Sequence, residues 1–260
     1  MSTATLPSGE SIFYTRSGNP DNPTIVLIGS IGSTHAMWNS VVPLLTDDYD
    51  VLAPDHRGHG QSSAPAGDYT THDLASDIIA LLDALDIETA EAVGLSIGGQ
   101  VVLQLAHDYP ERITRAVVTN TGAKIGTYES WEARASTVRA EGIEAIADGV
   151  VANWLTEPYK EEHPTVLAEL RDMLTSNDND GYAGCCMALA TFDATDWLGE
   201  ITVPVHAVGS TDDGPTPPAL TRAIADGAHG TFTQIGGAHI PAVEIPHDYV
   251  AAIRASQTQE

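Results

Sequence analysis

A serine lies between two glycines where the apolar pattern of the chain changes. A short, mostly apolar segment, 90–95, leads into Gly94-Leu95-Ser96-Ile97-Gly98, after which the apolar spacing becomes helical. A tight turn from strand to helix can present a serine hydroxyl as a nucleophile, with glycines where side chains would collide. The first N–H groups of the helix then face developing negative charge. A chance Gly-x-Ser-x-Gly is the alternative, and the flanking strand and helix argue against it.

Such a serine needs a base, and the base needs a carboxylate that orients it. In proteins with this turn the acid and then the histidine follow the serine along the chain. His239 lies just after the strand-like "GTFTQIG" and before the last expected helix, and we expect it to be the base. Asp212 and Asp213 both follow the strand-like "VPVHAVG". We prefer Asp212 for its offset from Gly209, although Asp213 fits better when counted back from Pro217.

A glycine-containing segment, "LIGSIGSTHAMW", follows the first expected core strand. Its glycines let backbone N–H groups face the site. We expect the N–H of Ser30 and the N–H of Ile97 to form an oxyanion hole, which stabilises negative charge on a carbonyl oxygen.

A second glycine-containing loop, "DHRGHGQS", follows the next strand. His56 and His59 within it suggest a metal site. A loop shaped by its glycines and fixed by Arg57 is the interpretation we prefer, so we expect neither a metal nor an organic cofactor.

The elements that would position these residues alternate between strand and helix in the first half of the chain. Short apolar runs that predict strands occupy 11–15, 24–29, 49–55, 90–94 and 115–120. Helical spacing covers 74–85 and 98–108. This alternation predicts an α/β fold with a mostly parallel central sheet flanked by helices.

From about Tyr128 to Thr191 the spacing is helical and no strand is predicted. Strand patterns return at 203–209 and 230–236, and a last helix is expected at 247–256. We therefore expect a core, 1–121 and 196–260, interrupted by a helical cap, 122–195. An insertion after the carboxyl end of a strand would cover the ligand crevice of such a sheet.

Composition excludes several classes of function. The net charge of −25 opposes binding to nucleic acid and to anionic membrane surfaces. No apolar run is long enough to span a bilayer, and the N-terminal residues do not resemble a signal peptide, so we expect a soluble, cytoplasmic protein. The adjacent Cys185 and Cys186 suit neither a disulfide framework nor a zinc site.

Taken together, these residues resemble the α/β-hydrolase superfamily and, within it, the 3-oxoadipate enol-lactonases. The resemblance covers nearly the whole chain. The stretches that carry it are "GSIGSTHAMW", "DHRGHGQSSAPAGDYT", "GLSIGGQVVLQLAHDYPERI", "TGAKIG", "EARASTVRAEGIEAIADGVVANWLT" after Trp131, and "GYAGCCMALATFD".

The resemblance implies a helical cap and hydrolysis of a small lactone, 3-oxoadipate enol-lactone, in aromatic catabolism. That lactone carries a free carboxylate, which a protein of this charge does not attract, so a local cation must bind it. Among the cations of the cap we choose Arg134, one helical turn after Trp131, and expect both residues to contact substrate. A solvated helix face is the alternative for Arg134.

Two other functions fit the same residues. A carboxylesterase or a cofactor-free perhydrolase would use the same serine, acid and histidine beneath a different cap. A non-catalytic protein of this fold would need only the pocket for a small ligand. The sequence leaves open whether the chain forms a homo-oligomer.

Overall fold

One eight-stranded sheet forms the centre of the protein in a computed structural model that describes residues 1–255. The strand order is β1-β2-β4-β3-β5-β6-β7-β8. Pairs that involve β2 are antiparallel, and all pairs from β4 to β8 are parallel. The strands are β1 (Ser2–Thr5), β2 (Ser11–Ser17), β3 (Thr24–Ile28), β4 (Asp50–Pro54), β5 (Ala90–Leu95), β6 (Ile113–Thr119), β7 (Val205–Ser210) and β8 (Thr231–Ile235). The predicted mostly parallel sheet is confirmed.

The central strands are buried on both faces, as their continuous apolar sequences require. Every residue of β3, β4 and β5 is buried. The edge strand β1 was not predicted, because its polar sequence "STAT" exposes all but one of its residues.

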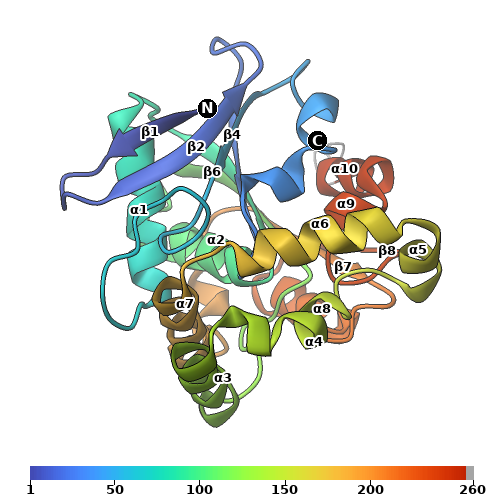
Figure 1. The fold of residues 1–260 in the computed structure, drawn as a ribbon. Coiled ribbons are helices and arrows are strands. Elements are labelled where there is room, and N and C mark those ends of the chain that lie inside the picture. Colours follow the sequence, from blue (N-terminus) through green and yellow to red (C-terminus); the bar gives the residue numbers. More distant parts are fainter. Residues whose placement is uncertain (256–260) are drawn as a thin grey trace.

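Helices cover the sheet and extend beyond it (Figure 1). They are α1 (Thr71–Ala84), α2 (Ile97–Asp108), α3 (Tyr128–Glu141), α4 (Ala147–Val151), α5 (Glu157–Glu162), α6 (Pro164–Thr175), α7 (Asn179–Thr191), α8 (Pro218–Gly227), α9 (Pro241–Glu244) and α10 (Pro246–Arg254). Single 3₁₀ turns are η1 (His35–Trp38), η2 (Val42–Leu44), η3 (Ile143–Ala145) and η4 (Leu198–Glu200). Helix α8 was not predicted, and residue 256 of the last predicted helix lies outside the described residues.

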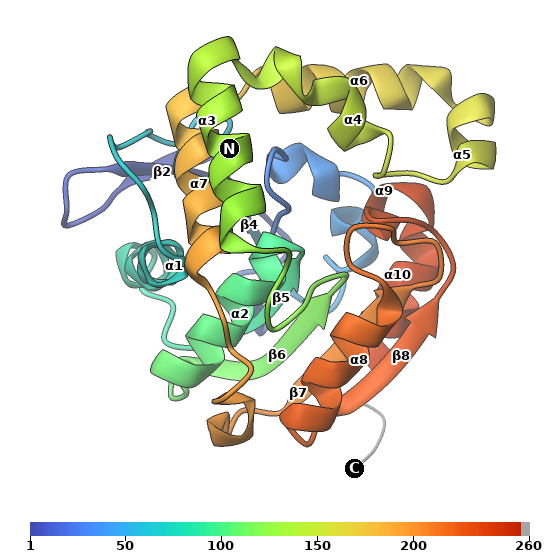
Figure 2. The same cartoon turned by 90° about the horizontal axis from the view of Figure 1, so that it is seen from below.

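Helices α3 to α7 form a separate group beside the α/β core (Figures 1 and 2). All five lie within the predicted cap range, 122–195, and no strand interrupts them. Helix α3 packs along α7, and Thr127 caps the start of α3 by accepting a hydrogen bond from the Ser130 N–H. The division of the chain into core and cap stays a prediction that this arrangement supports.

The backbones of the cap and the core approach each other closely at Gly181 and Gly58. A Cβ atom added to Gly58 would lie 2.4 Å from the Cα of Gly181, and one added to Gly181 would lie 2.3 Å from the Cα of Gly58. Close by, the Tyr69 N–H donates to the Gly184 carbonyl at 3.2 Å. Any side chain at either of the first two glycines would force the start of α7 away from the core.

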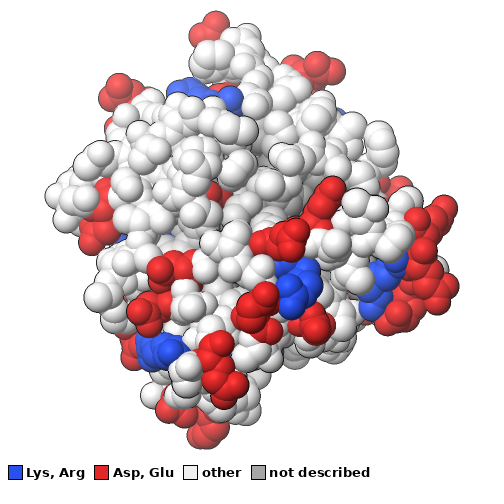
Figure 3. Space-filling view, in the orientation of Figure 1, with Lys and Arg blue, Asp and Glu red and all other residues white. Residues whose placement is uncertain are grey.

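Among the charged side chains on the face of the cap that Figure 3 shows, acidic ones prevail over basic ones. Several basic side chains there lie beside acidic ones; Arg171, for example, pairs with Glu144 and Asp148. Within residues 1–255, none of the helices combines the length and the apolar character needed to cross a bilayer.

Candidate active site

The predicted turn from strand to helix is present, and it holds Ser96 in a strained conformation. Strand β5 ends at Leu95 and α2 begins at Ile97, so Ser96 alone makes the turn, with φ 61° and ψ −119°. Residues other than glycine rarely adopt these backbone angles, and holding Ser96 in them costs about 1–3 kcal/mol. Such strain is common where a side chain must be presented for chemistry.

The two flanking glycines are required by contacts with the neighbouring backbone. A Cβ atom on Gly94 would lie 2.1 Å from the Gly98 carbonyl oxygen, and one on Gly98 would lie 2.2 Å from the carbonyl oxygen of Ile28. Ser96 is fixed further by hydrogen bonds, because its N–H donates to Thr119 O at 3.0 Å. The backbone of Ser96 is therefore held from several sides, while its side chain lines a cavity.

His239 lies in the loop after β8 and is bound to a buried carboxylate. Its Nδ1 atom lies 3.0 Å from both Oδ1 and Oδ2 of Asp213, and both residues are buried. Since a carboxylate only accepts, Nδ1 carries the proton and Nε2 is left to accept one. Asn120 also fixes this loop, because its Nδ2 donates to the carbonyls of Ala238 and His239 at 2.9 and 3.2 Å.

The prediction of Asp212 as the acid is wrong in this geometry. Its side chain is exposed and accepts from the Thr211 hydroxyl at 2.6 Å, while its N–H donates to the Gly237 carbonyl. Strand β7 continues to Ser210, one residue beyond the glycine from which the offset was counted. The carboxylate that contacts His239 is instead that of Asp213, the alternative that counting back from Pro217 favoured, and we propose it as the acid.

Thr216 holds the carboxylate of Asp213 and was missed in the sequence. The Thr216 N–H donates to Oδ1 at 2.9 Å, and its hydroxyl donates to Oδ2 at 2.7 Å. Aspartate side chains commonly accept a hydrogen bond from a backbone N–H two or three residues later, as in turns and helix caps. The pattern Asp-x-x-Thr before Pro217 was the signal that would have identified both residues.

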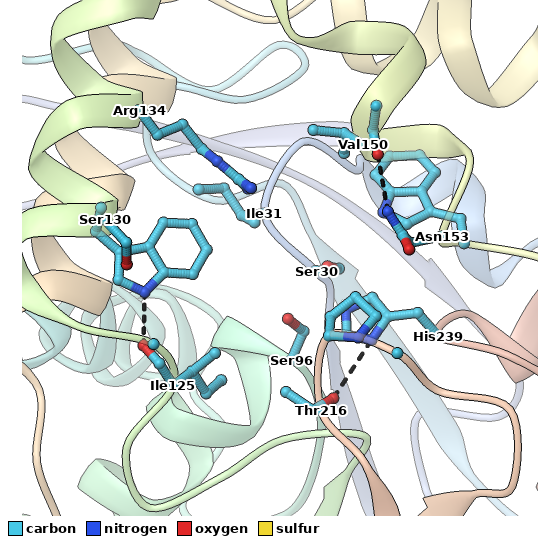
Figure 4. A pocket seen from close by; sticks show the side chains of 16 residues that line it. Ser30, Ile31, Ser96, Ile125, Ser130, Arg134, Val150, Asn153, Thr216 and His239 are labelled. Atoms are coloured by element: carbon cyan, nitrogen blue, oxygen red, sulfur yellow. Dashed lines mark hydrogen bonds between the residues drawn. The ribbon is translucent and has the colours of Figure 1, made fainter.

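A cavity of about 420 Å³ brings most of the predicted residues together. In Figure 4, Ser96, Thr216 and His239 lie on one side of it, and Arg134 extends into it from α3 on the other. The view draws no hydrogen bond between the Ser96 hydroxyl and His239. The full lining is Ser30, Ile31, Ser96, Ile125, Gly126, Ser130, Trp131, Arg134, Gly149, Val150, Asn153, Trp154, Gly214, Pro215, Thr216 and His239.

The two predicted oxyanion-hole residues differ in their position. Ser30 lines the cavity and is buried, and in residues 1–255 its hydroxyl has no hydrogen-bond partner. Ile97 is not part of the lining, because its side chain is buried in the core. Its N–H is the first of α2 and has no acceptor within the helix. Ile31 also lines the cavity and was not predicted.

Arg134 is unusual among the cations of this protein. Its guanidinium carbon lies 4.7 Å from the centre of the Trp131 ring, whose Nε1 donates to Ile125 O at 2.6 Å. In the described part of the chain, nine of the eleven Lys and Arg residues form an ion pair with a carboxylate, and Arg134 forms none. Arg222, which also has no ion pair there, stacks on Phe232 instead.

His56 and His59 contact backbone atoms. Across residues 1–255, no cluster of three or more His, Cys, Asp or Glu residues is arranged to hold a metal ion. The expected role of Arg57 is confirmed, because its Nε and one terminal nitrogen each lie 2.6 Å from Asp77, which fixes this loop to α1.

Comparison with known proteins identifies the family to which this fold belongs. Residues 23–141 match the alpha/beta hydrolase fold family. The chain is 36% identical to 3-oxoadipate enol-lactonase 2 of Acinetobacter baylyi and 30% identical to 3-oxoadipate enol-lactonase 1 of the same organism. Each alignment covers 93% of this chain and 91% of the relative. The crystal structure of the enol-lactonase from Burkholderia xenovorans superposes with a TM-score of 0.96 at 35% identity, over 99% of this chain and 100% of that one. The chain therefore belongs to the α/β-hydrolase family, in which it is similar over nearly its whole length to 3-oxoadipate enol-lactonases.

Proposed function

We propose that this protein hydrolyses 3-oxoadipate enol-lactone to 3-oxoadipate through an acyl-enzyme on Ser96. The observation that carries the proposal is one cavity that contains Ser96 and His239 on one side and, on the other, Arg134, which forms no ion pair within residues 1–255. A nucleophile alone would suit any ester. A half-buried guanidinium without a carboxylate partner suits a substrate that supplies the carboxylate itself.

In the first half of the reaction, His239 Nε2 removes the proton of the Ser96 hydroxyl while Oγ bonds to the lactone carbonyl carbon. The carbonyl electrons move onto oxygen, where backbone N–H groups at Ile97 and Ser30 stabilise the charge by about 3 kcal/mol each. Collapse of this intermediate breaks the ring C–O bond. His239 returns its proton to the departing oxygen, which becomes an enol and then a ketone.

The second half repeats the chemistry with water. His239 removes a proton from water, the hydroxide bonds to the acyl carbon, and the bond to Ser96 Oγ breaks as the serine regains its proton. Asp213 stabilises the imidazolium in both halves and keeps the ring in one orientation. The product leaves with one more carboxylate than the substrate, and this second negative charge favours its release from an acidic protein.

Arg134 would bind the free carboxylate of the substrate, with Trp131 as a rigid platform behind the guanidinium. We also propose a cytoplasmic location, since both cysteines are buried and free and such thiols suit a reducing compartment.

The test is turnover of enzymatically prepared enol-lactone, followed by the loss of its ultraviolet absorbance, with Ser96→Ala as the control. We expect wild type to consume the lactone and Ser96→Ala to lose at least about 10³-fold in kcat. A panel of uncharged esters separates the rivals. Faster turnover of plain esters than of the lactone would favour a carboxylesterase. If no ester is hydrolysed and a fluorophosphonate does not label Ser96, a binding protein is favoured.

A further inference from the structure

The loop between Gly29 and Ser33 carries Ser30 and Ile31 into the cavity beside Ser96. Backbone donors stabilise an oxyanion only when they are held within a few tenths of an ångström of their position. A glycine-containing loop does not supply that rigidity by itself. The contacts that fix this loop therefore bear on the rate of the reaction.

Two histidines of the neighbouring loop bind its backbone at both ends. His56 Nε2 donates to the Gly29 carbonyl at 2.8 Å, and His59 Nε2 accepts from the Gly32 N–H at 2.9 Å. Because a backbone N–H only donates, His59 Nε2 is unprotonated and the proton lies on Nδ1, which is 3.2 Å from the Arg57 carbonyl. Burial lowers the pKa of both histidines, that of His59 to about 3, and keeps both rings neutral.

A residue of the cap completes the arrangement from the opposite side. Asn177 lies between α6 and α7 and is 6% exposed. Its Nδ2 donates to the Gly32 carbonyl at 2.9 Å, and its Oδ1 accepts from the Gly60 N–H at 2.8 Å. One side-chain amide thus joins the cap to both loops, and the backbone groups of Gly32 are held by the core on one side and the cap on the other.

Gly32 itself is confined by this packing. Its φ is +81°, and a Cβ atom there would lie 2.4 Å from Leu174 Cδ1 in α6. The peptides on either side of Gly32 therefore have little freedom to rotate while His59 holds the Gly32 N–H and Asn177 holds the Gly32 carbonyl.

We propose that Asn177 and His59 are positioning residues. They fix the loop between Gly29 and Ser33, which carries Ser30, and so couple the cap to the reaction centre. This inference rests on the proposed serine mechanism. The cap then does more than enclose substrate and bind its carboxylate, because it also helps to position the Ser30 N–H, one of the two proposed donors to the oxyanion. A donor displaced by about 1 Å loses its effect on rate while the ground-state complex is little changed.

The test uses Asn177→Ala and His59→Leu, with Asn179→Ala as the matched control. The Asn179 side chain accepts only the Ile143 N–H in the described chain, a bond that stays within the cap. For each variant we would measure kcat and KM with a plain ester and with the lactone. We would also measure the inhibition constant of a boronic acid, which forms a tetrahedral anion on Ser96, and the affinity for 3-oxoadipate.

We expect Asn177→Ala and His59→Leu to lower kcat about 10- to 100-fold and to weaken boronate binding by a similar factor, with product affinity unchanged. Asn179→Ala should behave as wild type. His59→Gln, which keeps an acceptor for the Gly32 N–H, should recover most of the rate. Asn177→Asp keeps the acceptor for Gly60 but cannot donate to Gly32, and should resemble Asn177→Ala even if the latter is poorly folded.

Folded variants with wild-type kcat and boronate affinity, in an active enzyme, would overturn the positioning role alone. If Asn177 and His59 had a purely structural role, their replacement would lower the melting temperature and leave kcat and boronate affinity unchanged. A wild type that hydrolyses plain esters but not the lactone would refute the substrate and leave this test intact. A wild type without activity on either would overturn both proposals.

Discussion

His239 Nδ1 lies 3.0 Å from each oxygen of the Asp213 carboxylate, so that one ring nitrogen faces two acceptors at equal distance. The same carboxylate accepts from the Thr216 N–H and hydroxyl. This geometry fixes the tautomer of the imidazole and separates the roles of two adjacent aspartates, only one of which is turned inward.

Replacement of the two aspartates should therefore give very different enzymes. Asp213→Asn keeps the shape of the side chain but removes the charge that stabilises the imidazolium, and we expect kcat to fall about 10³- to 10⁴-fold. Asp212→Asn should change kcat less than about two-fold, because its side chain is exposed and contacts Thr211 instead. Steady-state kinetics of both variants decide the matter, and a larger loss in Asp212→Asn would reverse our assignment.

The carboxylate-binding role of Arg134 predicts an effect on KM rather than on kcat. Charged hydrogen bonds contribute about 1.5–3 kcal/mol, so Arg134→Ala should raise KM for the enol-lactone about 10- to 100-fold and leave KM for an uncharged ester unchanged. Arg222→Ala is the matched control, since Arg222 also stacks on an aromatic ring without an ion pair in the described chain. An unchanged KM for the charged lactone in Arg134→Ala would exclude the role.

The turn around Ser96 should not accept a single additional methyl group. In Gly98→Ala the new Cβ would lie 2.2 Å from the Ile28 carbonyl oxygen, and we expect a loss of about 3 kcal/mol or more in unfolding free energy. Gly149 in α4 has open space around it, so Gly149→Ala should stabilise the protein by about 0.5–1 kcal/mol. Urea unfolding measures both changes, and similar values for the two variants would contradict the packing described here.

Stability should decrease on mild acidification because three buried histidines resist protonation in the folded state. Desolvation lowers the pKa of His56, His59 and His206, that of His59 to about 3, whereas an unfolded histidine titrates near 6.5. Below pH 6.5 the unfolded chain therefore binds more protons than the folded one. Each histidine then lowers the unfolding free energy by up to about 1.4 kcal/mol per pH unit, and the contribution is fully retained above pH 6.5.

Urea unfolding at pH 7.5, 6.5 and 5.5 measures this slope. We expect little change between the first two values and a clear decrease between the last two. His59→Gln should show a smaller decrease than wild type, and equal slopes in both proteins would exclude His59 as a contributor.

The net charge of −25 predicts that salt stabilises the folded protein. Like charges repel each other in the compact state, and the screening length falls from about 10 Å at 0.1 M salt to about 3 Å at 1 M. We expect the melting temperature to rise by several degrees between these concentrations of NaCl. A melting temperature that stays constant or falls would indicate that the acidic side chains seen on the cap are already neutralised by their neighbours.

Local patterns in the sequence were enough to predict the sheet, the turn at Ser96 and the position of His239. Each depends on residues close together in the chain, such as the buried run of β3 or the glycines around the serine. The acid was mispredicted because a strand boundary is uncertain by a residue, and neighbouring residues in a turn point in different directions.

Contacts between distant residues could not be predicted in this way. The sequence presents Asn177 as one polar residue between two helices, and only the fold brings it to Gly32 and Gly60. The prediction of Arg134 followed its spacing from Trp131, but the absence of a carboxylate partner became visible only when the ion pairs of residues 1–255 were known.

The backbone contact between Gly58 and Gly181 limits how this enzyme can be recombined with its relatives. A chimera that combines this core with the cap of another protein will assemble only if that cap also has glycine at the position of Gly181, near the start of α7. Even alanine at that position would push the cap away from the core and break the hydrogen bonds between Asn177 and the loops that contain Gly32 and Gly60. Exchange of substrate specificity by swapping caps is thus restricted to donors that have glycine at the position of Gly181.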